Sequence, residues 1–172
     1  MKNKREYPKN LIYDLFGEDK EIEITKDILD GVEYAINQLD EEQTKIINQY
    51  YKNNLTLNQI SESLNTSRQN IFYKKTKILR KLRKPKLLRF IINGYEVSKT
   101  YLETKTIDNL DISYIDISVR AYNCLKRSGI NNVNEIKSIN QLKSVKCLGG
   151  RGISEIVCEL EKHGRKLPQE SE

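Results

Sequence analysis

The sequence predicts an all-α protein made of two small helical modules. Three observations lead to this fold class. A chain of 172 residues with 37 % hydrophobic content is large enough for one ordinary domain or two small ones. From Ile107 onward the apolar runs become shorter, which marks the start of a second unit. Apolar residues recur at helical spacing, and the segments follow residues that can cap a helix, namely Thr25, Asp40, Thr56, Ser67 and Ser118.

The N-terminal part is expected to pack into a core. Residues 1–24 are predicted to form an arm or a short docking helix, because residues 11–16 have amphipathic spacing and a glycine follows them. Thr25 is expected to cap a helix whose apolar residues share one face, with Gly31 as its weak point. Acidic residues outnumber basic ones from residue 17 to residue 42, so charge is sorted along the chain.

Two further helix starts follow. Asp40, with Gln43 three residues later, predicts the beginning of one helix. Thr56 offers a cap for the next, and the apolar residues of 57–64 recur at i, i+3 and i+7, which defines a helix of two turns. These helices and the one after them form a predicted helix-turn-helix domain over residues 25–86.

A tight break separates the two-turn helix from a long basic helix. Asn65 and Thr66 interrupt the helical pattern, and Ser67 can restart it. Residues 68–90 contain ten basic residues and no acidic one, and Pro85 is expected to end or bend this helix. A short helix, a tight turn and a basic helix are the parts of a DNA binder that reads the major groove.

The leading end of the basic helix carries side chains that recognise bases. Arginine forms a bidentate pair with guanine, and glutamine and asparagine form one with adenine. Backbone N–H groups at the starts of the two helices suit phosphates. The competing interpretation is a basic helix that is merely solvated. The predicted contacts to the major groove and its phosphates are Thr56, Ser67, Arg68, Gln69, Asn70, Tyr73, Lys74, Lys77 and Arg80.

Residues 56–85 resemble region 4 of bacterial primary sigma factors without a gap, down to the closing motif Leu-Arg-Lys-Leu-Arg-Lys-Pro. Taken over residues 25–90, the resemblance implies a helix-turn-helix that binds the promoter −35 element and sits on the flap of the RNA polymerase beta subunit. It assigns a principal base contact to Arg68. The family usually has Glu, Arg, Arg and Gln at four further positions, which are here Gln69, Asn70, Phe72 and Tyr73. Most of the base-reading set is therefore changed.

The C-terminal half is expected to hold a connector over residues 87–106, a helical module over 107–167 and a tail over 168–172. Ser118 is expected to open a helix that a glycine closes. Two brief helices and a longer last helix are expected to follow it.

Closely spaced glycines lie between two short helices in residues 147–156, Cys-Leu-Gly-Gly-Arg-Gly-Ile-Ser-Glu-Ile. Glycines permit positive φ angles and close backbone approach. A hairpin of this kind before a helix N-terminus makes a nest of N–H groups suited to a phosphate. It would grip DNA without reading its sequence. A tight helical turn with no ligand is the alternative.

Residues 115–126, Ile-Asp-Ile-Ser-Val-Arg-Ala-Tyr-Asn-Cys-Leu-Lys, together with 148–156 resemble the C-terminal domain of the RNA polymerase alpha subunit. The similarity extends over residues 107–167 and implies a helix-hairpin-helix that binds AT-rich DNA in the minor groove. A narrow AT-rich groove concentrates negative potential and attracts an inserted arginine. Gly152 stands where the family has a DNA-contacting serine. The residues that the resemblance assigns to DNA are Arg120, Asn123, Cys124, Gly149, Arg151, Gly152 and Glu155.

Signals for other chemistry are sparse. The single histidine, His163, has no matching nucleophile or acidic partner, so we expect a protein that is not an enzyme. The three cysteines show no paired spacing, so we expect reduced thiols and neither a metal nor a cofactor. No apolar run is long enough for a membrane span and no signal peptide is recognisable, which predicts a cytoplasmic protein without membrane contact.

The net charge of +6 favours an anionic partner. The hypothesis is a bacterial transcription regulator with bipartite promoter recognition: one module takes the major groove of double-stranded DNA and the other an AT-rich minor groove. The alternative is an adaptor or decoy that mimics polymerase modules and binds core RNA polymerase or competes with a sigma factor. A DNA-processing enzyme is a distant third hypothesis. The sequence leaves the oligomeric state open.

Overall fold

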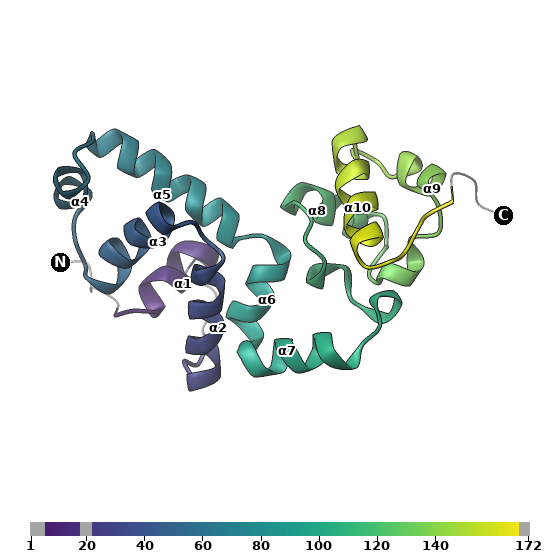
Figure 1. Cartoon of the computed structure of the whole chain (residues 1–172), viewed down its shortest axis with the longest axis horizontal. Coiled ribbons are helices and arrows are strands. Elements are labelled where there is room, and N and C mark those ends of the chain that lie inside the picture. The colour runs from purple at the N-terminus through teal and green to yellow at the C-terminus, as the bar shows by residue number, and fades with distance from the viewer. Residues whose placement is uncertain (1–5, 18–21, 169–172) are drawn as a thin grey trace. The chain divides into compact units, whose positions relative to one another are not determined.

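The computed structural model describes residues 6–17 and 22–168 (Figure 1). These residues form α-helices, short 3-10 helices and one π-helical segment, and no β-strand occurs among them. The predicted all-α class is confirmed. The described residues divide into two compact units. Unit 1 holds the residues up to Arg83 together with Phe90–Glu96, and unit 2 holds Lys84–Arg89 together with the residues from Val97 onward.

The helices of unit 1 that follow Thr25, Asp40, Thr56 and Ser67 begin where these capping residues predicted. The side-chain oxygens of Thr25, Asp40, Thr56 and Ser67 each accept a hydrogen bond from the backbone N–H three residues later. A π-helical segment, Asn48–Lys52, extends the third helix. The helices of this part are α1 (Lys9–Phe16), α2 (Lys26–Asn37), α3 (Glu41–Ile47), α4 (Leu57–Ser63) and α5 (Arg68–Leu82).

Helix α1 packs against α5 through polar as well as apolar contacts. The Arg83 guanidinium, just past the end of α5, donates hydrogen bonds to the backbone oxygens of Asp14 at 2.7 Å and Leu15 at 3.1 Å, so it caps the C-terminal end of α1. The Asp14 carboxylate accepts hydrogen bonds from the Tyr51 hydroxyl at 2.6 Å and from Lys75 Nζ at 3.1 Å. Burial and the bond to Asp14 raise the pKa of Tyr51. Through these contacts the inward side of α5 is held against α1.

Gly31 is a point of close approach and not the weak point expected of α2. A Cβ atom at this position would lie 2.0 Å from the backbone oxygen of Phe90. The Phe90 ring packs on Tyr34 of α2 with 4.2 Å between ring centroids. Glycine therefore lets two backbones meet here, and any side chain would push them apart.

Most of the stretch expected as a connector is helical. It contains α6 (Pro85–Asn93) and α7 (Tyr95–Thr104), separated by Gly94 with a φ of +92°. Pro85 begins α6, at the position where the N–H that proline lacks has no helical partner to lose. The apolar residues of α6 are compatible with a continued helix, but the turn signal at Asn93 and Gly94 favoured a connector for this stretch.

Unit 2 is a small bundle with a core of its own. Its helices after α7 are α8 (Val119–Arg127), α9 (Ile139–Ser144) and α10 (Gly150–Lys162), with 3-10 turns between them. Ser118 caps α8 as predicted, accepting a hydrogen bond from the N–H of Ala121 at 3.3 Å. The core side chains with no exposed surface are Ile112, Leu125, Val133, Ile136, Leu142, Ile156 and Leu160. Arg165 holds the backbone after α10, donating to the backbone oxygens of Val133 and Ile136 at 2.6 Å each.

Candidate nucleic-acid interface

The connection between α4 and α5 has the geometry of a helix-turn-helix. Asn65 adopts a left-handed conformation with a φ of +50°, and the Thr66 N–H donates to the Ser61 backbone oxygen at 2.9 Å, which closes the turn. Ser67 then caps α5, so the second helix starts immediately. Residues 67–70 are all exposed, and the first turn of α5 is accessible to a partner.

The outer surface at the start of α5 is formed by Gln69, Phe72, Tyr73 and Thr76. Their spacing of i, i+3, i+4 and i+7 places them on one side of the helix, and we call this surface the leading face. Phe72 is 57 % exposed and Tyr73 is 67 % exposed. Ile71 points the other way and is fully buried. The first two turns of α5 thus anchor the helix on one side and offer side chains on the other.

The cations of α5 fall into two groups, and the first group serves the fold. Lys75 has little exposed surface and pairs with the Asp14 carboxylate at 3.1 Å. Lys74 forms an ion pair with Glu42 of α3, and Lys81 donates a hydrogen bond to the Gln43 side chain at 3.2 Å. These ammonium groups are already paired inside unit 1.

The second group faces solvent. Arg68, Lys77 and Arg80 are exposed, and none forms an ion pair or a side-chain hydrogen bond with another of the described residues. Lys77 and Arg80 lie one and two turns beyond Tyr73 on the outer side of the helix. The free positive charge of α5 is therefore concentrated on the side that the fold leaves open.

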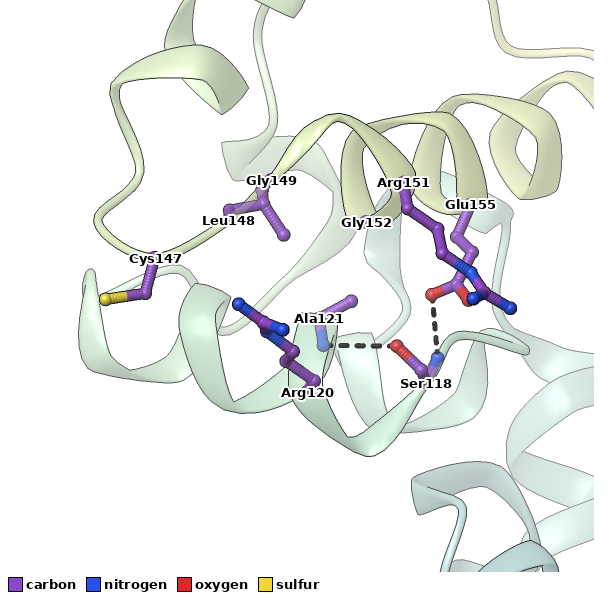
Figure 2. Close-up of a pocket in the computed structure, with 9 residues that line it drawn as sticks. All are labelled: Ser118, Arg120, Ala121, Cys147, Leu148, Gly149, Arg151, Gly152 and Glu155. Carbon is purple, nitrogen blue, oxygen red and sulfur yellow. Dashed lines mark hydrogen bonds between the residues drawn. The ribbon is translucent and has the colours of Figure 1, made fainter.

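Unit 2 has a pocket of about 350 Å³ between α8, α10 and the segment that precedes α10 (Figure 2). Arg120 projects from α8 and Arg151 from the first turn of α10, and both are exposed. Within the described part of the sequence neither guanidinium has an ion-pair or hydrogen-bond partner. The remaining lining residues are Ser118, Ala121, Cys147, Leu148, Gly149, Gly152 and Glu155.

Two family models match the protein. Residues 35–84 match the model of Sigma-70, region 4, and residues 98–162 match the model of the C-terminal domain of the bacterial RNA polymerase alpha subunit. The protein joins a sigma region 4 module to an alpha C-terminal domain module. We call residues 35–84 the sigma module and residues 98–162 the alpha module. Both resemblances drawn from the sequence are confirmed, and neither module is catalytic by itself.

RNA polymerase alpha subunits are among the curated proteins that this sequence resembles. The protein is 38 % identical over 78 residues to the DNA-directed RNA polymerase subunit alpha of Desulforamulus reducens, covering 44 % of this sequence and 25 % of that subunit. With the Carboxydothermus hydrogenoformans subunit the identity is 40 % over 65 residues, or 37 % of this sequence and 21 % of the subunit. With the Oenococcus oeni subunit it is 34 % over 73 residues, or 41 % and 23 %. The matched region thus spans at most a quarter of these three relatives.

In the sigma module the structure brings most of the predicted contact residues to the open side of α5. Three of them are partly committed within the fold. The Thr56 N–H donates to Gln59 Oε1 at 2.9 Å in a capping box, so this one N–H group is committed to the fold. Lys74 is held by its ion pair. Asn70 Nδ2 donates to Thr66 Oγ1 at 2.8 Å, which leaves Gln69 as the amide without an internal partner among the described residues.

In the alpha module the hairpin differs from the one predicted. None of its glycines has a positive φ; the left-handed residue is Cys147, with a φ of +65°. Gly149 is the N-cap of α10, and a Cβ atom there would meet no atom within 4 Å, so the backbone at this position is open. Gly152 has another role: a Cβ atom would lie 2.6 Å from Leu148 Cδ1. This glycine lets α10 approach the Leu148 side chain, and its contact with DNA stays a prediction.

Two residues of the predicted minor-groove set are structural. Cys124 is only 4 % exposed and packs in the core of unit 2, so its side chain serves the fold, and a contact with DNA stays a prediction. Glu155 Oε2 accepts a hydrogen bond from the Ser118 N–H at 3.3 Å, which ties α10 to the start of α8 (Figure 2). Asn123 is exposed one turn after Arg120 and stays a predicted contact. Ser118 and Leu148 line the pocket but were not among the predicted contacts, although both lie within motifs that the sequence had singled out.

Carboxylates before α8 are held ionised by their surroundings. Partial burial by itself would raise the pKa of Asp111, but hydrogen bonds from Ser113 and the charges of Lys126 and Arg89 outweigh it, and the net effect lowers the pKa. Burial is likewise outweighed at Asp116, where the hydrogen bond and charge of Lys84, at 2.8 Å, lower the pKa. Both carboxylates make their contacts with other residues of unit 2.

The described residues hold neither a membrane-spanning helix nor a metal cluster. No helix in residues 6–17 and 22–168 is long and apolar enough to cross a membrane. In the same ranges no three histidine, cysteine, aspartate or glutamate side chains gather closely enough to hold a metal ion. Of the three cysteines, Cys124 is buried and the other two are exposed free thiols.

Proposed function

We propose that this protein is a transcription regulator that binds promoter DNA at two places. The sigma module inserts α5 into the major groove, and the alpha module contacts an AT-rich minor groove. One observation carries the proposal: the cations of α5 that face the fold are paired, whereas Arg68, Lys77 and Arg80 are exposed without an internal partner among the described residues. Unpaired arginine and lysine on one side of a helix are the electrostatic footprint of a DNA contact.

The alpha module supports the second contact. Arg120 is an exposed guanidinium at the edge of a pocket, beside the open backbone of Gly149. An arginine of this kind suits a narrow minor groove, and a bare glycine backbone suits close approach to a phosphate. The alpha module thus offers charge and backbone, while the sigma module offers side chains that can read bases.

Joining the modules in one polypeptide strengthens both contacts. Once one module is bound, the other is held near the same DNA at a high effective concentration. Two weak sites then act as one stronger site without any new contact. The proposed regulator would recognise a promoter by the combination of a short base-read element and an AT-rich element.

The test is equilibrium binding of the full-length protein to fluorescently labelled duplexes across a salt series. We expect affinity to fall steeply with salt, Arg68→Ala to reduce discrimination between sequences, and Arg120→Ala to reduce affinity for AT-rich duplexes. Strong capture of core RNA polymerase without appreciable DNA affinity would overturn the proposal in favour of the adaptor. If neither variant changed DNA binding, that result would contradict the assigned contacts.

A further inference from the structure

The leading face of α5 lacks charge although the helix around it is basic. Its four side chains are an amide, two aromatic rings and a threonine, and the cations Arg68, Lys77 and Arg80 flank them along α5. The Thr76 hydroxyl donates to the backbone oxygen of Phe72 at 2.9 Å, which commits its polar group to the helix and leaves its methyl group for external contact. The surface is therefore largely apolar at its centre and positive at its margins.

The two aromatic side chains of this surface are mostly exposed. Phe72 and Tyr73 are 57 % and 67 % exposed, and neither ring contacts another aromatic ring or a cation among the described residues. Large aromatic side chains that stay mostly exposed are characteristic of binding surfaces. Their place beside Gln69, the amide without an internal partner among those residues, makes them part of one contact surface.

The cations that flank the leading face, together with its side chains, indicate which partner it binds. Three unpaired cations along one helix favour the phosphates of a duplex, and an α-helix fits the major groove. The apolar group that a major groove exposes is the C5 methyl of thymine, and aromatic and threonine side chains contact it. The base edge that a glutamine reads through two hydrogen bonds is adenine. Both groups belong to A·T base pairs.

We infer that the leading face reads consecutive A·T base pairs in the major groove, with Phe72 and Tyr73 on thymine methyl groups and Gln69 on an adenine edge. The inference rests on the proposed function and narrows it, because it names the base pairs. Arg68, at the margin of the face, is expected to pair with a guanine next to this run. The target differs from the one that the usual sigma residues would read, since four of those positions carry other side chains.

The experiment begins with selection of duplexes from a randomised pool by the full-length protein. We expect a motif that contains adjacent A·T pairs. Each thymine of that motif is then replaced by deoxyuridine, which removes only the C5 methyl group. Affinity should fall by about fourfold for each methyl group that packs on a ring, the effect of one buried apolar carbon. The methyl group lies in the major groove, so contacts of the alpha module in the minor groove do not contribute.

Variants link this loss to the rings. In Phe72→Ala and Tyr73→Ala, the thymine and deoxyuridine duplexes should bind more nearly alike. Lys77→Ala is the matched control, since it should weaken both duplexes equally. All three positions are accessible on the outer side of α5, and circular dichroism verifies the fold of each variant. A selected motif rich in G·C pairs, or equal affinity for the thymine and deoxyuridine duplexes, overturns the inference alone. Failure to bind any duplex overturns the proposed function as well.

Discussion

The two candidate DNA surfaces use positive charge differently. In α5, lysines on the core side hold the fold together while arginines and a lysine on the outer side stay free of ion pairs with the described residues. At the pocket of unit 2 both arginines face outward, and a carboxylate, Glu155, makes the contact that aligns the helices. On α5, cations serve both the fold and the candidate surface, whereas at the pocket the cations face outward and a carboxylate serves the fold. Mutations should separate these tasks in different ways.

The largest expected effect comes from an inner cation of α5. Lys75→Met removes the partner of Asp14 in a partly buried network, and we expect the free energy of unfolding to fall by about 2 kcal/mol. Lys77→Met changes a neighbouring lysine that faces solvent and should alter stability by less than about 0.5 kcal/mol. Chemical denaturation measures both. Equal stability of the two variants would contradict the division of the cations into two groups.

The next effect concerns the outward arginine of unit 2. Arg120→Ala should lower affinity for a duplex with an A-tract by about tenfold, the worth of one charged contact, and leave stability unchanged. Lys137, an exposed cation outside the pocket lining, provides the control, and Lys137→Ala should bind as the parent does. Anisotropy titration and thermal melting test the pair. A fall in melting temperature for Arg120→Ala would mean that this arginine also serves the fold.

Base analogues in the DNA test the contact in each groove while the protein is left unchanged. Inosine in place of guanine removes the amino group that distinguishes G·C pairs in the minor groove. We expect inosine in a G·C-rich duplex to raise affinity by about fivefold, the lower range of the cost of a mismatched pair. In Arg120→Ala this gain should disappear, while the deoxyuridine effect on the leading face should persist. If both analogues acted through one module, the assignment of one groove to each module would be wrong.

A smaller effect concerns salt. Removal of one phosphate contact should reduce the slope of log affinity against log salt concentration by about 0.9. Lys77→Ala should show this change without altering the selected motif, because a phosphate contact carries no base information. Binding at four or more salt concentrations measures the slope. An unchanged slope would remove Lys77 from the phosphate contacts.

The smallest effect is a shift in acid sensitivity. Asp111 has a lowered pKa in the fold, so its contribution to stability is present above its unfolded pKa and is lost as the pH falls through the folded pKa. Ser113→Ala removes one hydrogen bond to this carboxylate and should raise the pKa of Asp111, moving the loss to higher pH. NMR titration of the carboxyl resonances follows the change. Asp116, whose pKa depends on Lys84, is the internal control and should titrate as before.

Local signals in the sequence predicted the helix starts well because capping is a local interaction. Ser67 and Ser118 cap the helices that carry the two candidate DNA surfaces, as their positions indicated. Helix α6 was assigned to the connector although its apolar residues could continue a helix, and α7 was missed because its apolar residues show no clear helical period. The role of Gly31 was also invisible, since the Phe90 oxygen that it faces comes from a distant part of the sequence.

The candidate sites were predicted by residue type, and the errors arose where tertiary contacts decide the role. Cys124 follows Asn123 directly on α8, yet one lies in the core and the other on the surface. Glu155 matches a position of the family pattern, but its contact with the Ser118 N–H is known only from the fold. The sequence could not divide the lysines of α5 either, because their partners lie on α1 and α3.

Ile71 is the only buried residue in the first six positions of α5. Ile71 is thus the side chain that joins this end of the helix to the core, and its exposed neighbours can vary at a smaller cost in packing. Exposed side chains here can change while the scaffold persists, which fits a sigma module in which four of these positions differ from the usual set. The same arrangement makes this stretch a suitable place to transplant new recognition residues.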